Sequence, residues 1–422
     1  MGLSSAPGPA SKRQACHFCV RSILPPVPVS RNVRLLSAFN FFEDFRPYAP
    51  FIVLYLAQVT GSYAAGGGVI ALSMVAWSAF EVPTGILSDM VGRVRTMALG
   101  AISTALGMML WSMGTSTASL AAGSVVMGLG AAFASGNNVA FLHDTLAEEG
   151  RGDEYAHFLG RTSALFQVGL GVSALFGGLL ALHSLRATML AGIVPPVLGT
   201  ILTFFMTEPR VHASGESTNV FAHVGEALRH FRKNARLRNL SMASMLDWGL
   251  GQAQWDFLPV FLGSLWPAWA VGIARTLSHI FACLSFWFAG RVLKRFEPLR
   301  TLIAGRAFCE SVAIVIYAVP TVASPLILSV LSGFFGIKKT AEGTLLQREF
   351  TDRQRATMGS LNQLGGSLVF GACAILLGVL ADRVGIVQTL IISEFVLLLG
   401  IFFYRQAFRH GKAGSDLRVE HA

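Results

Sequence analysis

The sequence predicts an all-α membrane protein in which twelve transmembrane helices form two pseudo-symmetric six-helix bundles, with both chain ends in the cytosol. Three observations lead to this prediction. Apolar residues make up 53% of the 422 residues and charged residues only 13%, whereas soluble domains carry roughly 25% charge. Twelve apolar stretches are long enough to cross a bilayer, and the two halves of the chain repeat one another.

Each of the twelve stretches approaches the roughly 20 residues that a bilayer-spanning helix requires. We place them near 34–58, 66–88, 96–114, 119–142, 159–182, 187–206, 238–263, 268–290, 301–319, 324–346, 358–381 and 385–404. They divide the chain into a disordered cytosolic tail (1–32), a first bundle (33–206), a cytosolic linker (207–237), a second bundle (238–405) and a cytosolic C-terminal tail (406–422).

The basic residues set the orientation of these helices. With the N-terminus inside, most of the 33 Lys and Arg residues fall in the tails and the cytosolic loops, whereas the loops on the other side hold only Arg186 and Arg383. This asymmetry is what the positive-inside rule requires. We therefore expect a multi-pass protein of the cell inner (plasma) membrane. Because the net charge of +10 is spread over many short loops, we expect no nucleic-acid partner.

Two segments outside the predicted spans carry recognisable patterns. Cys16 and Cys19 form a lone CxxC in the polar tail, and since no second pair completes a zinc site, we expect no bound metal. In the linker, the segment 220–239 has apolar residues at helical spacing opposite a basic face. That pattern predicts an amphipathic helix lying on the inner membrane surface.

The internal repeat relates the first half of the chain to the second. A constant shift superimposes Gly85 on Gly290, Arg95 on Arg300, Thr96 on Thr301, Gly100 on Gly305 and Gly128 on Gly333. Membrane transporters are often built from such repeats, and their substrate site lies between the repeats near the bilayer midplane.

The segment 83–95 between the second and third predicted spans holds the most distinctive charges. Asp89 lies where a helix leaves the lipid, a position that is costly for a carboxylate without a cation or a helix N-terminus nearby. Gly85 would let a neighbouring helix approach closely, and Gly92 permits a turn with positive φ. Arg93 and Arg95 can pair with carboxylates or hold anionic lipid headgroups.

This segment resembles the loop between the second and third helices of major facilitator superfamily transporters, whose pattern is G-x-L-x-D-[RK]-x-G-R-[RK]. The matching residues are Gly85, Leu87, Asp89, Gly92, Arg93 and, one place late, Arg95, whereas Met90 replaces the usual basic residue. The resemblance covers residues 33 to 405 and implies a twelve-helix secondary transporter. In the second half Lys294 stands at the Asp89 position, so the loop is intact only once.

The end of the fourth predicted span adds a third member to this loop. Asp144 begins a D-[ST]-L pattern, with Thr145 and Leu146, that ends in Gly160 and Arg161 and resembles a branch of bacterial permeases of the same superfamily. The resemblance implies a charge relay of Asp89, Arg93 and Asp144. Such a relay would clamp the cytosolic side and break as the halves rock, so it identifies a gate and leaves the cargo open.

Glu81 precedes Pro83, Thr84 and Gly85 in a Glu-x-Pro-[ST]-Gly form that is similar to drug-efflux members of the superfamily. Pro83 should kink or weaken the end of the second span. The resemblance implies either a proton-linked role for Glu81 or a place in a structural charge network.

The first predicted span contains a charged cluster of Glu43, Asp44 and Arg46. Glu43 and Arg46 lie three residues apart, so they can pair on one helix face. Charged residues inside membrane spans are functional candidates by default. Two interpretations stay open, namely a cluster that binds protons or substrate and a pair that neutralises itself for structural reasons.

The seventh predicted span is polar and aromatic around Asp247 and Asp256, with Trp248, Gln252 and Trp255 among them. Such a segment suits a binding cavity for an amphipathic or cationic organic molecule. The alternative is hydrogen bonding between helices together with aromatic residues at the membrane interface.

Two further spans of the second half carry charges at helical spacing. Arg275 and His279 lie four residues apart on one face of the eighth span, and Arg306 and Glu310 should pair in the ninth.

The last three spans add further charges. In the tenth span, Lys338 and Glu342 can pair, which would leave Lys339 to face a cavity or another helix. Glu394 in the twelfth span has no obvious partner.

Two family signatures are altered in this chain. The fourth span of many members carries an arginine tied to proton coupling, and here Ser124 stands in its place. The fifth span of many antiporters has a Gly-Pro bend, and here residues 173–174 read Ser-Ala. Proton antiport is therefore less secure than membership of the superfamily. The sequence also contains no catalytic constellation, so we expect no enzyme and no cofactor.

We interpret the chain as a monomeric secondary transporter that works by alternating access and binds a small molecule and protons or another coupling ion. The first hypothesis is proton-coupled efflux of small organic, cationic amphipathic compounds. The second is a carrier of a specific anionic metabolite, which Lys338, Lys339 and Arg275 would favour. A third, of another class, is a transport-inactive membrane scaffold or sensor.

Overall fold

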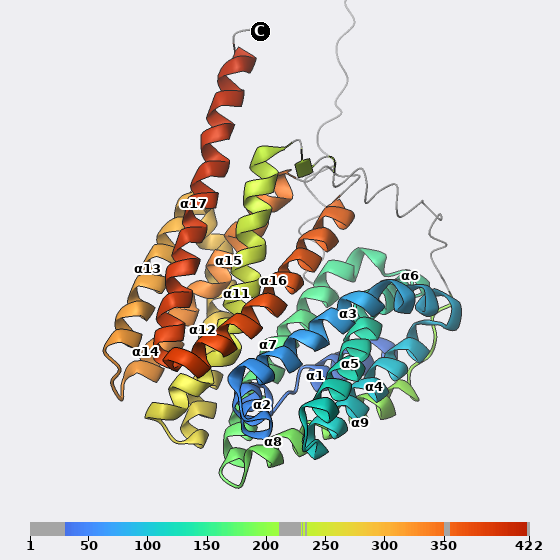
Figure 1. Cartoon of the computed structure of the whole chain (residues 1–422). Helices are drawn as coiled ribbons and strands as arrows, with labels where there is room; N and C mark the ends of the chain where they lie inside the picture. The colour runs from blue at the N-terminus through green and yellow to red at the C-terminus, as the bar shows by residue number, and fades with distance from the viewer. Residues whose placement is uncertain (1–29, 211–228, 230, 233, 350–354, 420–422) are drawn as a thin grey trace, which may run out of the picture.

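The computed structural model describes residues 30–210, 229, 231–232, 234–349 and 355–419, and in this part of the chain all regular structure is helical (Figure 1). The first half contains α1 (Arg31–Glu43), η1 (Ala49–Phe51), α2 (Ile52–Thr60), α3 (Tyr63–Val91), α4 (Arg93–Met113), α5 (Thr117–Ala134), α6 (Asn137–Glu148), η2 (Gly152–Glu154), α7 (Tyr155–Ala181), α8 (Leu185–Ala191) and α9 (Val194–Thr203). The second contains α11 (Ala235–Leu265), α12 (Ala268–Arg295), α13 (Pro298–Ala318), α14 (Ser324–Leu331), η3 (Ser332–Phe334), α15 (Phe335–Glu349), α16 (Arg355–Val384) and α17 (Ile386–Val419).

All twelve predicted spans fall on one helix or on two consecutive helices. Among the described residues, eight helices or helix pairs are long and apolar enough to cross a membrane, and Ala49–Thr60 and Leu165–Ala181 are shorter apolar helices. The prediction of a polytopic helical membrane protein is thus confirmed, while the count of twelve stays a prediction. Cys16, Cys19, most of the tail 1–32 and most of the segment 220–239 lie outside the described residues.

The first predicted span is not one continuous helix. Helix α1 ends at Glu43, and the chain resumes helical geometry only at η1 and α2. Pro47 lacks a backbone N–H, and it disfavours helical geometry at the preceding Arg46. The cluster of charged residues in this span therefore lies at a helix end and in a non-helical connection.

Three more predicted spans are interrupted. Between α5 and α6, Gly136 has a φ of +71°, a geometry that glycine adopts without steric strain. Between α8 and α9, Val194 is followed by two prolines at the start of the new helix, and between α14 and α15 the chain tightens into η3.

Polar side chains start several of the helices. Ser62, Ser116, Ser184 and Asn234 each accept a hydrogen bond from a backbone N–H in the first turn of α3, α5, α8 and α11. Such caps satisfy N–H groups that have no partner within the helix. Helix α4 differs, because its N-cap Gly92 has no side chain.

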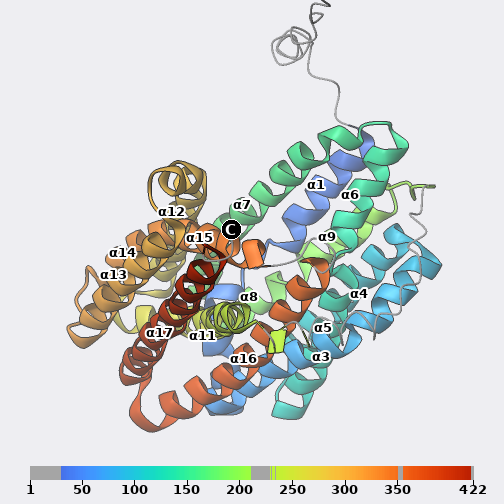
Figure 2. The same ribbon diagram turned by 90° about the horizontal axis from the view of Figure 1, so that it is seen from above.

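The helices form two bundles, one from α1 to α9 and one from α11 to α17, and Figures 1 and 2 show them side by side. The bundles meet along two helix pairs, α3 with α16 and α7 with α12. Small residues allow these approaches. Gly378 packs on the backbone of Ala64 in α3, and Gly178 packs on Gly272 in α12.

We call the end of the molecule that carries Asp89 and Arg93 the gate end, and the end that carries Ser62 and Asp382 the far end. Helix α3 joins the two ends, because its 29 residues span about 43 Å.

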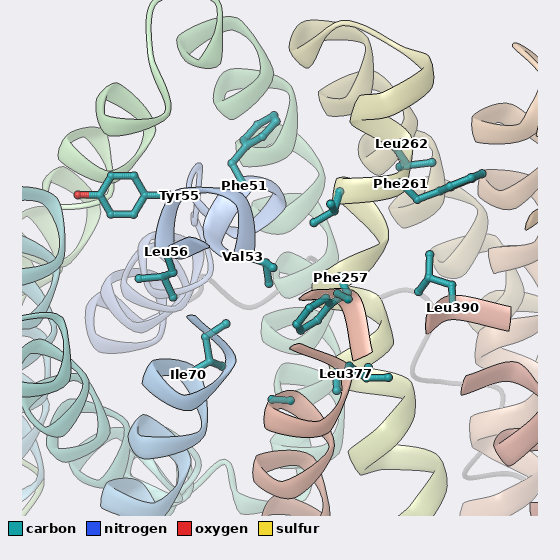
Figure 3. Close-up of a cluster of buried hydrophobic side chains, with 14 of the residues drawn as sticks. Phe51, Val53, Tyr55, Leu56, Ile70, Phe257, Phe261, Leu262, Leu377 and Leu390 are labelled. Atoms are coloured by element: carbon teal, nitrogen blue, oxygen red, sulfur yellow. The ribbon is translucent and has the colours of Figure 1, made fainter. Parts of the chain in front are cut away.

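One large hydrophobic cluster joins the bundles toward the far end. Figure 3 shows its centre, with Phe51 and Ile70 of the first bundle close to Phe257 and Leu377 of the second. Toward the gate end each bundle instead has its own cluster. Leu36, Met97 and Phe141 belong to that of the first bundle, and Leu240, Leu302 and Tyr404 to that of the second. The bundles are therefore held together by burial of apolar surface at the far end.

Candidate transport cavity and gate

A cavity of about 580 Å³ lies between the bundles, with walls from both. Its wall is rich in aromatic rings, which suits an organic ligand. The aromatic residues that line it are Phe39, Phe42, Phe45, Tyr48, Trp77, Trp111, Phe166, Trp248, Trp255 and Phe370.

Four of the charged residues singled out in the sequence line this cavity. Glu43 and Arg46 come from the first bundle, and Asp256 and Arg275 come from the second. The remaining coupling or binding candidates are not among its lining residues. They are Asp44, Glu81, Asp247, Lys338, Lys339 and Glu342.

The Glu43 carboxylate is held by an amide from α6. Asn138 donates Nδ2 to the Glu43 carboxylate at 2.6 Å and also to Asn40 at 2.9 Å. Glu43 and Arg46, which their spacing would allow to pair, form no ion pair among the described residues. Because α1 ends at Glu43, the Arg46 guanidinium bonds the backbone carbonyl of Glu43 at 3.1 Å and pairs with Asp44 at 3.4 Å.

The opposite wall is built by α11 and α12. The Arg275 guanidinium lies 3.3 Å from the centre of the Trp255 ring, and its side chain is buried. His279, one turn further along α12, meets Trp255 edge-on and shares a hydrogen bond of 3.0 Å with Gln167 of α7. Asp256 accepts a hydrogen bond from Gln252 at 3.2 Å.

A second set of buried charges lies within the second bundle. Arg306 pairs with Asp247 and, at 3.6 Å, with Glu310 as the sequence predicted. Tyr404 donates to Asp247 at 2.8 Å. Asp247 thus serves an internal network rather than the cavity, because α11 presents it and Asp256 to different neighbours.

The predicted pairing in α15 is wrong. Lys338 pairs with Glu310 of α13 at 3.4 Å, and Glu342 pairs with Lys339 at 3.2 Å. Spacing along one helix could not reveal the carboxylate that α13 supplies. Glu394, which had no obvious partner in the sequence, accepts a hydrogen bond of 2.6 Å from Gln254.

At the gate end, the structure brings the three predicted relay residues together. Gly92 has a φ of +99° and turns the chain from α3 into α4. Arg93 then lies 3.1 Å from Asp89 and 3.7 Å from Asp144. Arg95 is exposed.

Three further residues, Glu208, Ser88 and Asn137, join this cluster, and sequence reasoning missed them. Glu208 accepts hydrogen bonds from the backbone N–H groups of Arg93 and Val94 at 2.5 and 2.9 Å, and so caps α4. Ser88 accepts from Arg93 at 3.0 Å and donates to Asn137 at 2.9 Å. A glutamate at the end of the sixth predicted span was the available signal for Glu208.

In α3, Gly85 and Glu81 have surroundings that differ from those expected from the sequence. A Cβ atom at Gly85 would meet no heavy atom within 4 Å, so the predicted close helix approach at Gly85 is wrong for this arrangement. The far-end half of α3 makes the close contacts to α16 instead. Glu81 is exposed and accepts a hydrogen bond from Ser135 at 3.1 Å.

At the far end, Asp382 connects the two bundles, and the sequence analysis did not single it out. Its carboxylate accepts from the Ser62 hydroxyl at 2.6 Å and from the N–H groups of Tyr63 and Ala64 at 2.8 and 2.9 Å. A signal was present in the sequence, because residues 378–385 repeat the G-x-L-x-D-x-x-G spacing of residues 85–92.

Two helical bundles around an aromatic, charged cavity, with a cluster of charged residues at one end, together with the family match that follows, point to a membrane transporter rather than an enzyme. The chain belongs to the Major Facilitator Superfamily, whose sequence model matches residues 35–372. The resemblance stated from the loop at residues 83–95 is thereby confirmed at the level of the superfamily.

Solved transporter structures share this fold. A bacterial homolog of the human lysosomal transporter Spinster, in an inward-facing and unoccupied conformation, is 16% identical with a TM-score of 0.73, over 90% of this chain and 98% of that one. The nucleoside transporter NupG is 15% identical with a TM-score of 0.73, over 90% and 99%. A D-xylose–proton symporter is 12% identical with a TM-score of 0.70, over 88% and 95%. The sequence matches none of the curated proteins with which it was compared.

Proposed function

We propose that this secondary transporter exports small amphipathic organic compounds in exchange for protons. The observation that carries the proposal is the cavity between the bundles, which combines aromatic walls with ionisable side chains from both halves. Binding between two halves is the basis of alternating access in this class of transporter. The proposal includes twelve membrane-spanning helices, cytosolic chain ends, the inner membrane as location and a monomer as the working unit.

The candidates for proton coupling narrow to Glu43 and Asp256. Both line the cavity, one from each bundle, and each accepts a hydrogen bond from a neutral amide rather than from a cation. Asp44 is paired with Arg46, and Asp247 with Arg306. A carboxyl group without a tight cationic partner can exchange a proton at a lower energetic cost.

We assign gating to the relay of Asp89, Arg93 and Asp144. The relay joins the ends of α3, α4 and α6 within the first bundle. The relay is formed while the two bundles keep separate hydrophobic clusters at the gate end, so closure of that end would bring the second bundle against the relay and change its contacts. This role makes the scaffold hypothesis less favourable, because a transport-inactive protein has no need for a gate.

A second candidate function is transport of an anionic metabolite. Lys338 and Lys339, which the sequence offered in its favour, are both engaged by glutamates. The specific observation that favours an anionic substrate is that Arg275 lines the cavity.

Proteoliposomes with an internal pH dye test the proposal. Without an imposed gradient, we expect addition of a transported compound to move protons in the wild type and not in E43Q or D256N. The variant E81Q is a matched control, because Glu81 does not line the cavity. Proton movement that persists in both E43Q and D256N would contradict the coupling assignment, and movement lost in E81Q alone would transfer it to Glu81.

A further inference from the structure

The Arg275 guanidinium is a cation in the cavity wall whose donors are not used by the protein. Arg275 is only 4% exposed, and among the described residues its Nε and Nη1 atoms have no hydrogen-bond partner. Buried donors without an acceptor are strongly unfavourable. Arg46, the other cation of the cavity, differs because it already contacts Asp44 and a backbone carbonyl.

Trp255 packs against the Arg275 guanidinium, whose Nε and Nη1 atoms are buried without an acceptor among the described residues. The central carbon of the guanidinium lies over the Trp255 ring, and the pair of His279 and Gln167 supports Trp255 from the side. Stacking uses the face of a guanidinium, whereas its N–H donors point outward in the plane. Asp256 is the nearest acid along α11, yet no ion pair within 4.0 Å joins it to Arg275 among the described residues.

We infer that Arg275 binds the carboxylate of an amphipathic monocarboxylic acid inside the cavity. Two in-plane N–H groups match the two oxygens of a carboxylate. A doubly charged phosphate fits less well, because one cation would leave a negative charge unmatched beside Asp256. The aromatic rings of Trp248 and Phe370 would contact the apolar body of the ligand. The inference rests on the proposed function in one respect, namely that this cavity is the transport site.

Calorimetric titration of the purified full-length protein tests this inference with three ligands that share a naphthalene ring and differ in the charge of the attached group. The probes are naphthalene-2-carboxylate, its uncharged carboxamide and the cationic 2-(aminomethyl)naphthalene. We expect the wild type to bind the carboxylate roughly 10- to 100-fold more tightly than the carboxamide, as a charge-assisted pair of hydrogen bonds predicts. The variant R275Q should lose this preference and keep its affinity for the carboxamide, which also shows that the variant is folded.

Two matched variants sharpen the test. R275K keeps the charge without the planar fork, so it should retain only part of the preference. R46Q should retain all of it. Equal affinities of the wild type for carboxylate and carboxamide, tighter binding of the amine, or a preference that survives in R275Q would each overturn the inference. Since binding needs no gradient, its result is independent of whether protons move in liposomes.

A separate observation carries a second inference, at the far end. The Asp382 carboxylate at the end of α16 caps the N-terminus of α3 across the boundary between the bundles, with three hydrogen bonds of 2.6 to 2.9 Å. A carboxylate at a helix N-terminus is favoured by the helix dipole as well as by the hydrogen bonds. These contacts join the second bundle to the first in this structure, at the end where the bundles share one hydrophobic cluster.

The loop around Asp382 repeats the gate loop at the opposite end of the molecule. Asp382 and Gly385 follow the spacing of Asp89 and Gly92, and both glycines have positive φ, at +85° and +99°. We propose that Asp382 is a positioning residue that holds the far end shut and releases α3 when the cavity opens there.

The distance between two spin labels, one on each bundle, measures how far the far end is open. Leu182 follows α7 and Val322 precedes α14, both in exposed loops. With cysteines at these two positions and the native cysteines replaced, D382A should add a population with a longer distance that the wild type lacks. R383A on the same helix end should not, and D382E should restore part of the short population. An unchanged distribution in a D382A protein with normal transport would overturn the proposal.

Discussion

Arg93 contacts two carboxylates that differ in exposure. The Asp89 side chain is 71% exposed, whereas that of Asp144 is only 7% exposed. An exposed pair contributes about 0–1 kcal/mol, but removal of the partner of a buried carboxylate is far more unfavourable. The stabilising contact of this cluster is therefore the one between Arg93 and Asp144, and the exposed Asp89 can change partners at little cost in the gating that we propose.

We predict that R93A lowers the free energy of unfolding by about 3 kcal/mol, because it leaves the buried Asp144 carboxylate without its cation. D89A should change it by less than about 1 kcal/mol. The loss of unfolding free energy in the double variant R93A/D144A should be about 1–3 kcal/mol smaller than the sum of the losses in R93A and in D144A. Thermal unfolding in detergent of the wild type, R93A, D89A, D144A and R93A/D144A would measure these changes, and additive effects of R93A and D144A would contradict the pairing.

A second prediction concerns the cap on α4. Glu208 accepts two backbone N–H groups at a helix start whose N-cap is a glycine. We expect E208A to destabilise the protein by about 1 kcal/mol. The matched control is E297A, because Glu297 precedes α13, the counterpart of α4, and makes only an exposed pair with Arg300. The same thermal assay would detect the difference, and equal melting temperatures would show that the cap is not stabilising.

At the scale of helices, small residues decide how closely the bundles meet. A Cβ atom on Gly378 would lie 2.6 Å from the Cα atom of Ala64, a backbone atom that cannot move aside cheaply. Gly263 of α11 has nothing within 4 Å of such an atom. We therefore expect a methyl group to be accepted at Gly263 and not at Gly378.

We predict that G378A pushes α16 away from α3 and lengthens the distance between labels at residues 182 and 322, whereas G263A leaves it unchanged. Substrate-driven proton movement should fall several-fold in G378A, because far-end closure is one half of the cycle. If G378A retains both the wild-type distance and the wild-type rate, the close contact does not control closure.

The positions of the helices could be predicted from the sequence, whereas their interruptions and their contacts with other helices could largely not. Each of the twelve apolar runs coincides with described helices, since a helix that is buried in lipid needs an apolar composition. The breaks at Pro47 and Gly136 were missed because the hydropathy of a stretch of sequence does not depend on its backbone torsion angles. The partners of Lys338 and Asp247 were missed because they come from α13, which spacing along one helix cannot reveal. The gate relay was predictable, since its residues follow a family pattern.

At the scale of the whole molecule, burial is asymmetric between the ends. The bundles share one hydrophobic cluster toward the far end and keep separate clusters toward the gate end. Closure of the gate end would thus require new contacts between the bundles and loss of those made by Asp382, Gly378 and Gly178. In the alternating access that we propose, these two sets of contacts would exchange around a cavity that stays between the bundles.

The most direct test of this account is the accessibility of the cavity from each side of the membrane. Ala131 lines the cavity, so A131C in a background without native cysteines can report access to a membrane-impermeant maleimide in vesicles of either orientation. We predict labelling from the gate side in the resting protein, and added labelling from the far side in D382A. Labelling from the gate side alone in every variant and with every transported compound would contradict alternating access through this cavity.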